Sequence, residues 1–163
     1  MSLATFSIVG AASDGARWAL AQYFAELESR FAGGFDTAAA LAEATTDYDP
    51  PLGLFVIAEL EGDIVGCGAI RWVDEATGEI KRMWVDVKRR GIGLGTDLLA
   101  HLERIVLASG RTTAVLDTNE TLTEAIELYR RAGYAPVDRY NDNPYAHLWF
   151  SKQLNPGQAA SDR

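Results

Sequence analysis

The chain has 163 residues, of which 48% are hydrophobic and 23% charged, and it carries a net charge of −8 at pH 7. This length and composition predict one globular domain with a sizeable core, while the acidic balance argues against nucleic acid as the main partner. No apolar run is long enough to cross a membrane, and the N-terminus lacks the basic region of a signal peptide. The single cysteine, Cys67, excludes an internal disulfide and fits a reducing cytoplasm.

The first third of the chain predicts one short strand and two helices. Ser and Asp are favoured helix N-caps, apolar residues recur at helical spacing in the first helix, and a pair of glycines ends it. Two prolines after the second, alanine-rich helix mark a loop. The expected elements are a strand over 5–9, a helix from Ser13 or Asp14 to about Phe31, a helix over 38–44 capped by Asp36 or Thr37, and a loop over 45–53.

The remainder predicts a meander of strands followed by a strand–helix–strand crossover. Three apolar strands separated by tight turns form the meander, and the crossover implies a parallel pair of strands. We expect strands over 54–60, 64–73, 79–87, 113–116, 134–139 and 146–152, a helix from about Gly95 to Ser109, and a helix opened by the capping box Thr121–Glu124 and ended by Gly133. The predicted fold class is α/β (α+β), a single domain over 1–154 with a mixed, mostly antiparallel sheet, helices on both faces, and a disordered tail over 155–163.

A glycine-rich loop before the central helix carries the most specific chemical signal. It reads Arg90-Gly91-Ile92-Gly93-Leu94-Gly95-Thr96, and five of the 15 Lys and Arg residues lie between positions 81 and 90. Glycines let the backbone approach a ligand closely, and the amide groups of a helix start attract anions. The loop therefore predicts a phosphate or pyrophosphate site, although a solvated surface is the simpler explanation for any single one of these cations. A dinucleotide fingerprint and a P-loop both require other spacings.

Further segments occur in a fixed order around this loop. They are Glu79-Ile80-Lys81-Arg82-Met83-Trp84-Val85 before it, Leu98-Leu99 after it, and then Thr118-Asn119, residues 125–129 and Ala132-Gly133-Tyr134. With Arg90, Gly93 and Gly95 matching an R-x-x-G-x-G pattern, residues 54–154 resemble the GCN5-related N-acetyltransferase (GNAT) family. Segments 31–36 and 143–150 also resemble the acetyltransferase half of bacterial regulators that fuse it to a winged-helix DNA-binding domain, a second domain for which this chain has no room.

The resemblance implies direct transfer of an acetyl group from acetyl-CoA to a primary amine in a ternary complex, without a metal. It also implies that the loop amides hold the CoA pyrophosphate, that backbone groups near Trp84 and Val85 pair with the pantetheine arm like an added strand, and that Asn119 contacts this arm or makes a turn. Arg90 either contacts phosphate or shields the loop. The cofactor-binding residues implied in this way are Trp84, Val85, Arg90, Gly91, Ile92, Gly93, Leu94, Gly95, Thr96 and Asn119.

Two residues are expected to act in catalysis. The resemblance implies that Tyr129 protonates the leaving thiolate, and packing in the core is its alternative role. Glu79 matches a position that supplies the base in some members of the family, directly or through water. Its alternative role is an ion pair, because Lys81 and Arg82 follow it on the same strand.

The acceptor amine, a small molecule or a peptide, is not named by the sequence. Neither His101 nor His147 has a partner at a metal-ligand spacing, so we expect no metal site. A homodimer is compatible with the resemblance, and a non-catalytic CoA-binding module on the same fold is the rival interpretation. The residues expected around the acceptor, most of which packing or turn formation would also explain, are Phe31, Phe35, Trp72, Asn141, Asp142 and Tyr145.

Overall fold

The computed structural model describes residues 3–156, apart from the side chains of residues 43–45. Its strands are β1 (Thr5–Val9), β2 (Gly53–Leu60), β3 (Asp63–Trp72), β4 (Thr77–Val85), β5 (Thr113–Thr118), β6 (Ala135–Val137) and β7 (Leu148–Gln153). Its helices are α1 (Asp14–Arg30), α2 (Thr37–Asp47), α3 (Leu94–Ala108) and α4 (Thr123–Arg131), with a 3₁₀ turn, η1 (Val87–Arg89), before α3. Within this described part, no helix is both long and apolar enough to span a bilayer.

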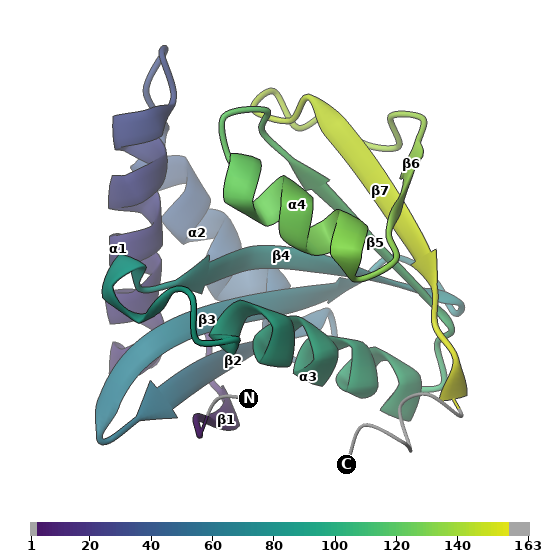
Figure 1. The fold of residues 1–163 in the computed structure, drawn as a ribbon, viewed down its shortest axis with the longest axis horizontal. Helices are drawn as coiled ribbons and strands as arrows, with labels where there is room; N and C mark the ends of the chain where they lie inside the picture. Colours follow the sequence, from purple (N-terminus) through teal and green to yellow (C-terminus); the bar gives the residue numbers. More distant parts are fainter. Residues whose placement is uncertain (1–2, 157–163) are drawn as a thin grey trace.

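The strands form one seven-stranded sheet in the order β1-β2-β3-β4-β5-β7-β6. The β4–β5 pair is parallel, and the other neighbouring pairs are antiparallel. Figure 1 shows α1 and α2 against one face of the sheet and α3 and α4 against the other. The mixed sheet, its meander, its parallel crossover and the helices on both faces are therefore confirmed.

Each face of the sheet has its own apolar core. Strand β4 contributes to both cores, although Ile80 and Trp84 are four residues apart and would lie on the same face of a regular strand. The irregularity in its pairing with β3, described next, places one extra residue between them and so turns Trp84 to the opposite face. Ile80 packs in the core beneath α3 and α4, whereas Trp84 packs in the core beneath α1. Truncating a buried aromatic residue such as Phe24, which is 0% exposed, would cost about 3–5 kcal/mol of stability. These two cores hold β4 in place, and the end of β4 in turn positions the glycine loop.

A β-bulge interrupts the pairing of β3 with β4. Cys67 pairs with Trp84 and Ala69 with Lys81, so the single residue 68 of β3 faces two residues of β4, 82 and 83. Arg82 takes up the irregularity with φ of 56°, a conformation that L-residues seldom adopt. Gly66 and Gly68 flank Cys67, and glycines inside a strand often mark a bulge, which the register shows here. The extra residue belongs to β4.

The parallel strands β4 and β5 separate beyond a short ladder. Their register covers only Thr77–Thr113, Gly78–Ala114 and Glu79–Val115, although β4 continues to Val85. From there β5 keeps its pairing with β7 as far as Thr118. The last part of β4 therefore has no ladder with β5, which leaves a strand edge next to the glycine loop.

Two predicted boundaries in the first half of the chain are wrong. Helix α2 runs to Asp47 and takes in the first residues of the predicted loop. Strand β4 ends at Val85 rather than at Val87, because the Asp86 side chain accepts a hydrogen bond from the Lys88 amide and starts the 3₁₀ turn.

The predicted capping box at Thr121–Glu124 is also wrong. Helix α4 begins at Thr123, and its N-cap residue, Leu122, makes no side-chain capping bond. The amide and hydroxyl of Thr121 both donate to Asn119 Oδ1, at 2.9 and 2.8 Å, while Glu124 pairs with Arg30. Both ends of the box are therefore occupied by other partners. The following strand, β6, is likewise shorter than the predicted 134–139.

Candidate functional site

The glycine loop exposes the start of α3. Gly91 and Gly93 have φ of 87° and 84°, a region that costs other L-residues about 1–2 kcal/mol. Gly93 is the N-cap of α3, and no side chain caps this helix. The first amides of the helix, at Leu94 and Gly95, therefore have neither an intrahelical nor a capping partner. The positive end of the helix dipole lies at the same point and favours an anion.

A cleft of about 520 Å³ opens in front of this loop, and we call it the loop cleft. It contains nearly all the residues expected at a cofactor, with two exceptions. Ile92 is 45% exposed and lies outside the lining, and Asn119 lies deeper in the molecule. The lining comprises Tyr23, Glu26, Arg30, Met83, Trp84, Val85, Arg90, Gly91, Gly93, Leu94, Gly95, Thr96, Leu122, Glu124, Ala125, Leu128, Tyr129 and Arg131.

Strand β4 offers this cleft mainly its backbone. The indole of Trp84 is 7% exposed and belongs to the core under α1, and it meets the half-exposed ring of Trp18 edge-on at 6.2 Å. Because β4 has left its ladder with β5 at this point, a ligand in the loop cleft can lie along the strand edge at Trp84 and Val85. This geometry suits an extended, amide-containing chain.

Two arginines connect the walls of the loop cleft. Arg90 donates from Nη2 to Glu26 Oε1 at 2.6 Å and from Nε to the Val85 carbonyl at 3.1 Å. Arg30 of α1 holds Glu124 of α4 in a two-pronged pair, at 2.9 and 3.2 Å. This pair lowers the pKa of Glu124 to about 2, chiefly through the hydrogen bond from Arg30. Helices on opposite faces of the sheet are thereby linked beside the cleft.

A narrow hollow of about 70 Å³ lies behind the loop cleft, and we call it the throat. It shares Tyr23, Met83, Leu122, Ala125 and Tyr129 with the loop cleft. On its other side it adjoins a third hollow of about 490 Å³, which we call the network pocket, and the two share Phe35, Lys81, Arg82, Asn143 and Tyr145. The remaining lining of the network pocket is Asp36, Ala39, Ala40, Arg71, Asn141, Asp142 and Pro144. The three hollows therefore follow one another through the molecule, with the narrowest in the middle.

Tyr129 lies where the loop cleft meets the throat. It belongs to α4, is 7% exposed, and packs near the rings of Tyr134 and Phe150 at 6.1 and 6.3 Å. Burial raises the pKa of its phenol above the ordinary value. The hydroxyl therefore stays protonated at neutral pH.

Asn119 is 8% exposed and lines the throat. Its Nδ2 donates to the Tyr145 carbonyl at 2.7 Å, and its Oδ1 accepts from Thr121 as described above. The turn before α4, one of the two roles expected for Asn119, is present in the structure. The same side chain ties the residue 145 loop to the start of α4.

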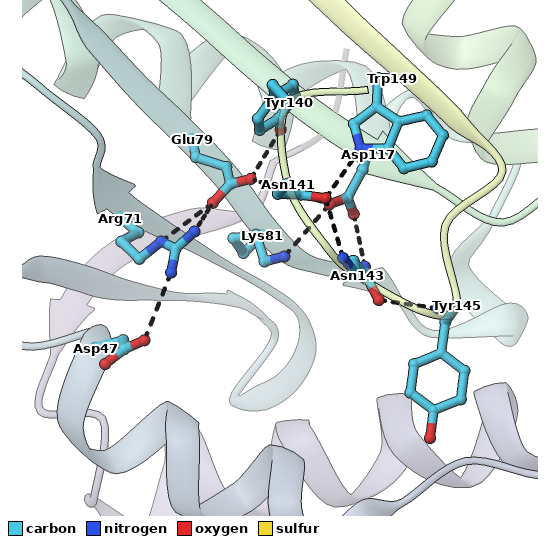
Figure 2. Close-up of polar contacts among 10 residues, drawn as sticks. All are labelled: Asp47, Arg71, Glu79, Lys81, Asp117, Tyr140, Asn141, Asn143, Tyr145 and Trp149. Carbon is cyan, nitrogen blue, oxygen red and sulfur yellow. Dashed lines mark hydrogen bonds and ion pairs between the residues drawn. The ribbon is translucent and has the colours of Figure 1, made fainter. Parts of the chain in front are cut away.

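Glu79 is enclosed by hydrogen-bond donors, as Figure 2 shows. Its side chain is 0% exposed, and its Oε1 accepts from Arg71 Nε and Nη2 at 3.1 and 2.7 Å. Its Oε2 accepts from Tyr140 at 2.7 Å and from Asn141 at 3.2 Å. Burial and the adjacent Glu79 raise the pKa of Tyr140, so its hydroxyl stays a donor. Glu79 lines none of the three hollows, and its ion pair is a buried one with Arg71.

A second carboxylate, Asp117 at the end of β5, does line the throat. Its oxygens accept from Asn141 at 2.6 Å and from Asn143 at 3.0 Å, and Lys81 Nζ lies 3.7 Å away. Asn141 also accepts a hydrogen bond from Trp149 at 2.9 Å, which fixes its amide (Figure 2). Sequence reasoning missed Asp117, Arg71 and Tyr140. An aspartate that ends a buried, apolar strand was the one available signal.

Trp72 is the expected acceptor residue that the structure places elsewhere. It packs in the core beneath α3, and Arg111 lies over its ring at 4.2 Å. The alternation of β3 explains this, because its neighbour Arg71 faces the network pocket. The other five expected residues, Phe31, Phe35, Asn141, Asp142 and Tyr145, line the throat or the network pocket.

Both histidines and the single cysteine lie outside these hollows. His101 stacks on Phe6 at 4.8 Å, and burial lowers its pKa. His147 accepts a hydrogen bond from the Glu120 amide at 3.2 Å. Cys67 is buried, and burial raises the pKa of its thiol. Among the described residues, no group of three or more His, Cys, Asp and Glu side chains could hold a metal ion.

The seven-stranded sheet, the glycine loop at a helix start and the strand edge beside it define the architecture of an acyl-CoA N-acyltransferase. The acetyltransferase (GNAT) family matches residues 18–134. The chain therefore belongs to this family, and it is an enzyme of the acetyltransferase class.

Individual relatives agree with this assignment. An uncharacterised N-acetyltransferase of Schizosaccharomyces pombe is 31% identical over 114 residues, which cover 69% of this chain and 70% of that protein. A GNAT-family acetyltransferase of Staphylococcus aureus superposes with a TM-score of 0.78 at 17% identity, over 93% of this chain and 100% of the other. A GNAT-family acetyltransferase of Elizabethkingia anophelis with acetyl-CoA bound superposes with a TM-score of 0.68 at 17% identity, over 94% and 100%. At these identities the two structures support the fold.

Proposed function

We propose that this protein transfers the acetyl group of acetyl-CoA directly to a primary amine, with both substrates bound at once. The observation that carries the proposal is the throat, which joins the loop cleft to the network pocket and has Tyr129 at one end and Asp117 in its wall. A thioester that enters from the cleft and an amine that enters from the pocket would meet there. Holding two reactants in attack geometry supplies a large part of the rate enhancement of such reactions.

The loop cleft suits CoA along its whole length. The amides over 91–96 would hold the pyrophosphate at the positive end of α3, and the edge of β4 at Trp84 and Val85 would pair with the pantetheine arm. Arg90 already holds Glu26 and the Val85 carbonyl, so shielding and bracing the loop is the role that we propose for it. Asn119 would act by shaping the throat.

The reaction needs a proton donor for the leaving sulfur. The amine nitrogen attacks the thioester carbonyl carbon, a carbon–nitrogen bond forms, and the carbon–sulfur bond breaks. An ammonium substrate loses two protons in all, of which one ends on the CoA thiol and one is released. Tyr129 would supply the proton to the thiolate, a step that typically contributes about 10²–10⁴-fold in rate.

The first proton must leave the ammonium before attack. We expected Glu79 to be the general base that takes this proton, and its surroundings lead us to propose another carboxylate. Glu79 is fully buried and receives four hydrogen bonds, from Arg71, Tyr140 and Asn141. We therefore propose that it positions these side chains, and we call Glu79, these three residues, Asp117 and Asn143 the network. Asp117 is the carboxylate in the wall of the throat, and we propose that it takes this proton. Asn141 and Asn143 would hold its oxygens in place throughout.

A panel of amines tests this function directly. The purified chain is mixed with acetyl-CoA and each amine, and release of CoA thiol is followed alongside mass detection of the acetylated product. We expect at least one amine to give both signals, and Asp117→Asn to lower kcat by about a hundredfold while leaving CoA affinity unchanged. Asp97→Asn, on α3, is the matched control. If CoA binds but no amine is acetylated, the chain is a CoA-binding module and the proposal is wrong.

Several further predictions concern the setting of the enzyme. We propose action on a small-molecule or peptide amine without nucleic acid or membrane, in the cytoplasm, as the net charge of −8 and the single buried cysteine suggest. A bacterial origin, a homodimer and the likeness to winged-helix fusion proteins stay predictions. The expected tail over 155–163 lies mostly outside the described residues.

A further inference from the structure

The network pocket has a basic floor beneath an acidic rim. Arg71 and Lys81 line the pocket from β3 and β4, and their side chains are only 37% and 10% exposed. The two acidic lining residues, Asp36 and Asp142, are exposed, and Asp36 is engaged in capping α2. A ligand that reaches the floor therefore meets cations.

The β-bulge creates this floor. In a regular strand, residues 81 and 82 would point to opposite faces. Arg82, with its φ of 56°, lines the throat and the network pocket together with Lys81. Two consecutive cations of β4 thus lie on one face, in a protein whose net charge is −8. Backbone conformations of this kind cost about 1–3 kcal/mol and tend to occur at functional sites.

The acidic partners of these cations are themselves shared with neutral donors. Glu79 accepts from Tyr140 and Asn141 as well as from Arg71, and Asp117 accepts from Asn141 and Asn143. Asp47, which lies 3.8 Å from Arg71 Nη1, also accepts from the Thr46 hydroxyl. Lys81 Nζ lies 3.7 Å from Asp117, an ion-pair distance that is too long for a hydrogen bond. An ammonium has three donors, so Lys81 has hydrogen-bonding capacity for a ligand anion.

We propose that the network pocket selects acceptors that carry a carboxylate a few bonds from the reacting amine, as α- and β-amino acids do. Lys81 donates hydrogen bonds to the carboxylate, while Arg71, whose Nε and Nη2 donate to Glu79, contributes its charge and its remaining Nη1 donor. Because Lys81 lines both the pocket and the throat, a carboxylate bound to it places a nearby amine at the throat. This inference rests on the proposed acetyl transfer, because it names the class of acceptor for that reaction.

Matched substrate pairs test the inference. Each of a set of α- and β-amino acids is compared with its own carboxamide, with acetyl-CoA as the donor and thiol release as the readout. We expect kcat/KM to be about tenfold to a hundredfold higher for the carboxylates, mainly through a lower KM, as one charge-assisted hydrogen bond provides. Intrinsic reactivity favours the carboxamides, whose amines lose a proton more readily, so this preference would come from the pocket. Equal or better turnover of the carboxamides overturns the inference.

A variant pair identifies the residue responsible. Lys81→Gln should lower the ratio of kcat/KM for the amino acids to kcat/KM for their carboxamides by about tenfold or more. Arg17→Gln, at an exposed position of α1, removes the same charge and should leave this ratio unchanged. If Lys81 acted only by positioning Asp117, Lys81→Gln would lower kcat/KM equally for the amino acids and the carboxamides. That result would also overturn the inference. Calorimetric binding of CoA confirms that each variant is folded.

The two proposals fail in distinguishable ways. If neutral alkylamines or peptides are acetylated and free amino acids are not, the acetyltransferase function stands and the carboxylate inference is wrong. If CoA binds and no amine of either class gives product, the proposed function is wrong, and the inference is overturned with it.

Discussion

The loop cleft and the network pocket are built from different kinds of groups. The loop cleft offers backbone amides at a helix start and a strand edge, and glycines at 91 and 93 keep the approach open. The network pocket offers side chains from β3, β4 and the loop before β7, held by one another's hydrogen bonds (Figure 2). A ligand shared by many enzymes can be held by backbone, whereas selection of one acceptor requires side chains.

Because of this difference, we expect substitutions in the two regions to affect binding and folding stability to different extents. Backbone amides at a helix start are solvated when no ligand is present, so the loop cleft can lose its ligand without disturbing the core. The network contains the buried carboxylate Glu79, and a buried charge without its partners is costly. Changes at the glycine loop should therefore act mainly on affinity, and changes among the hydrogen-bonded side chains around Glu79 should also affect folding.

The largest expected effect is at the glycine loop. Gly93→Asp places a carboxylate where we propose that the pyrophosphate binds, and like charges in contact cost several kcal/mol, so CoA affinity should fall by a hundredfold or more. Aspartate is a good N-cap, so α3 should persist. Gly110→Asp, at another positive φ of 90°, controls for backbone strain. Titration calorimetry measures both, and normal CoA binding by Gly93→Asp would contradict the backbone site.

Removal of the Tyr129 hydroxyl comes next. Tyr129→Phe should lower kcat by about a hundredfold and leave CoA affinity within about twofold, because packing of the ring is kept. Tyr134→Phe is the matched control, since Tyr134 donates to Glu103 and lies outside the three hollows. Steady-state kinetics with any acetylated amine serves as the measurement. Equal kcat for Tyr129→Phe and the unmodified chain would assign Tyr129 to core packing.

Removing a charge from the network should lower the stability of the fold. Glu79→Gln removes the buried partner of Arg71, which is 37% exposed, so the loss should fall somewhat below the range for fully buried pairs, at about 2 kcal/mol. For a chain of this size, Tm should drop by roughly 4–8 °C. Glu28→Gln, exposed on α1, should leave Tm unchanged. Differential scanning calorimetry tests this, and an unchanged Tm would show that the network does not support the fold.

The smallest effect concerns the pair Arg30–Glu124 beside the loop cleft. The folded pKa of Glu124 is lowered from 4.5 to about 2, so the pair stabilises the fold above the unfolded pKa and is lost as pH falls from about 4.5 to 2. Because Glu124 is 61% exposed, screening limits the contribution to less than about 1 kcal/mol. Tm measured against pH should therefore converge for the unmodified chain and Glu124→Gln at low pH. A constant difference down to pH 2 would place the stabilisation elsewhere.

Much of the sheet could be predicted because its signals are local. The hairpin of β2 and β3 follows from two apolar runs around a tight turn, and the glycine loop follows from spacing within seven residues. Boundaries that depend on tertiary partners could not be predicted in this way. Thr121 and Glu124 look like a capping box, but Asn119 and Arg30 are their partners in the fold.

The same distinction applies to the site. The half of the loop-cleft lining that lies within residues 83–96 was predicted, apart from Met83 and the placement of Ile92. The walls that α1 and α4 contribute were not predicted, except for Tyr129. Glu79 was identified as important, but its environment depends on Arg71 and Tyr140, which lie in β3 and in the loop before β7. Asp117 was missed for the same reason, because its significance comes from Lys81 and two asparagines that only the folded chain brings to it.

The two wide hollows open separately and have no lining residue in common. Under the proposed function, donor and acceptor would load in either order, and each product would depart through its own entrance. Excess acceptor should not compete with acetyl-CoA, so initial-rate patterns should intersect rather than run parallel. The throat has a volume of only about 70 Å³. It would therefore limit the size of the groups directly attached to the nucleophilic nitrogen, whatever the rest of the acceptor contains.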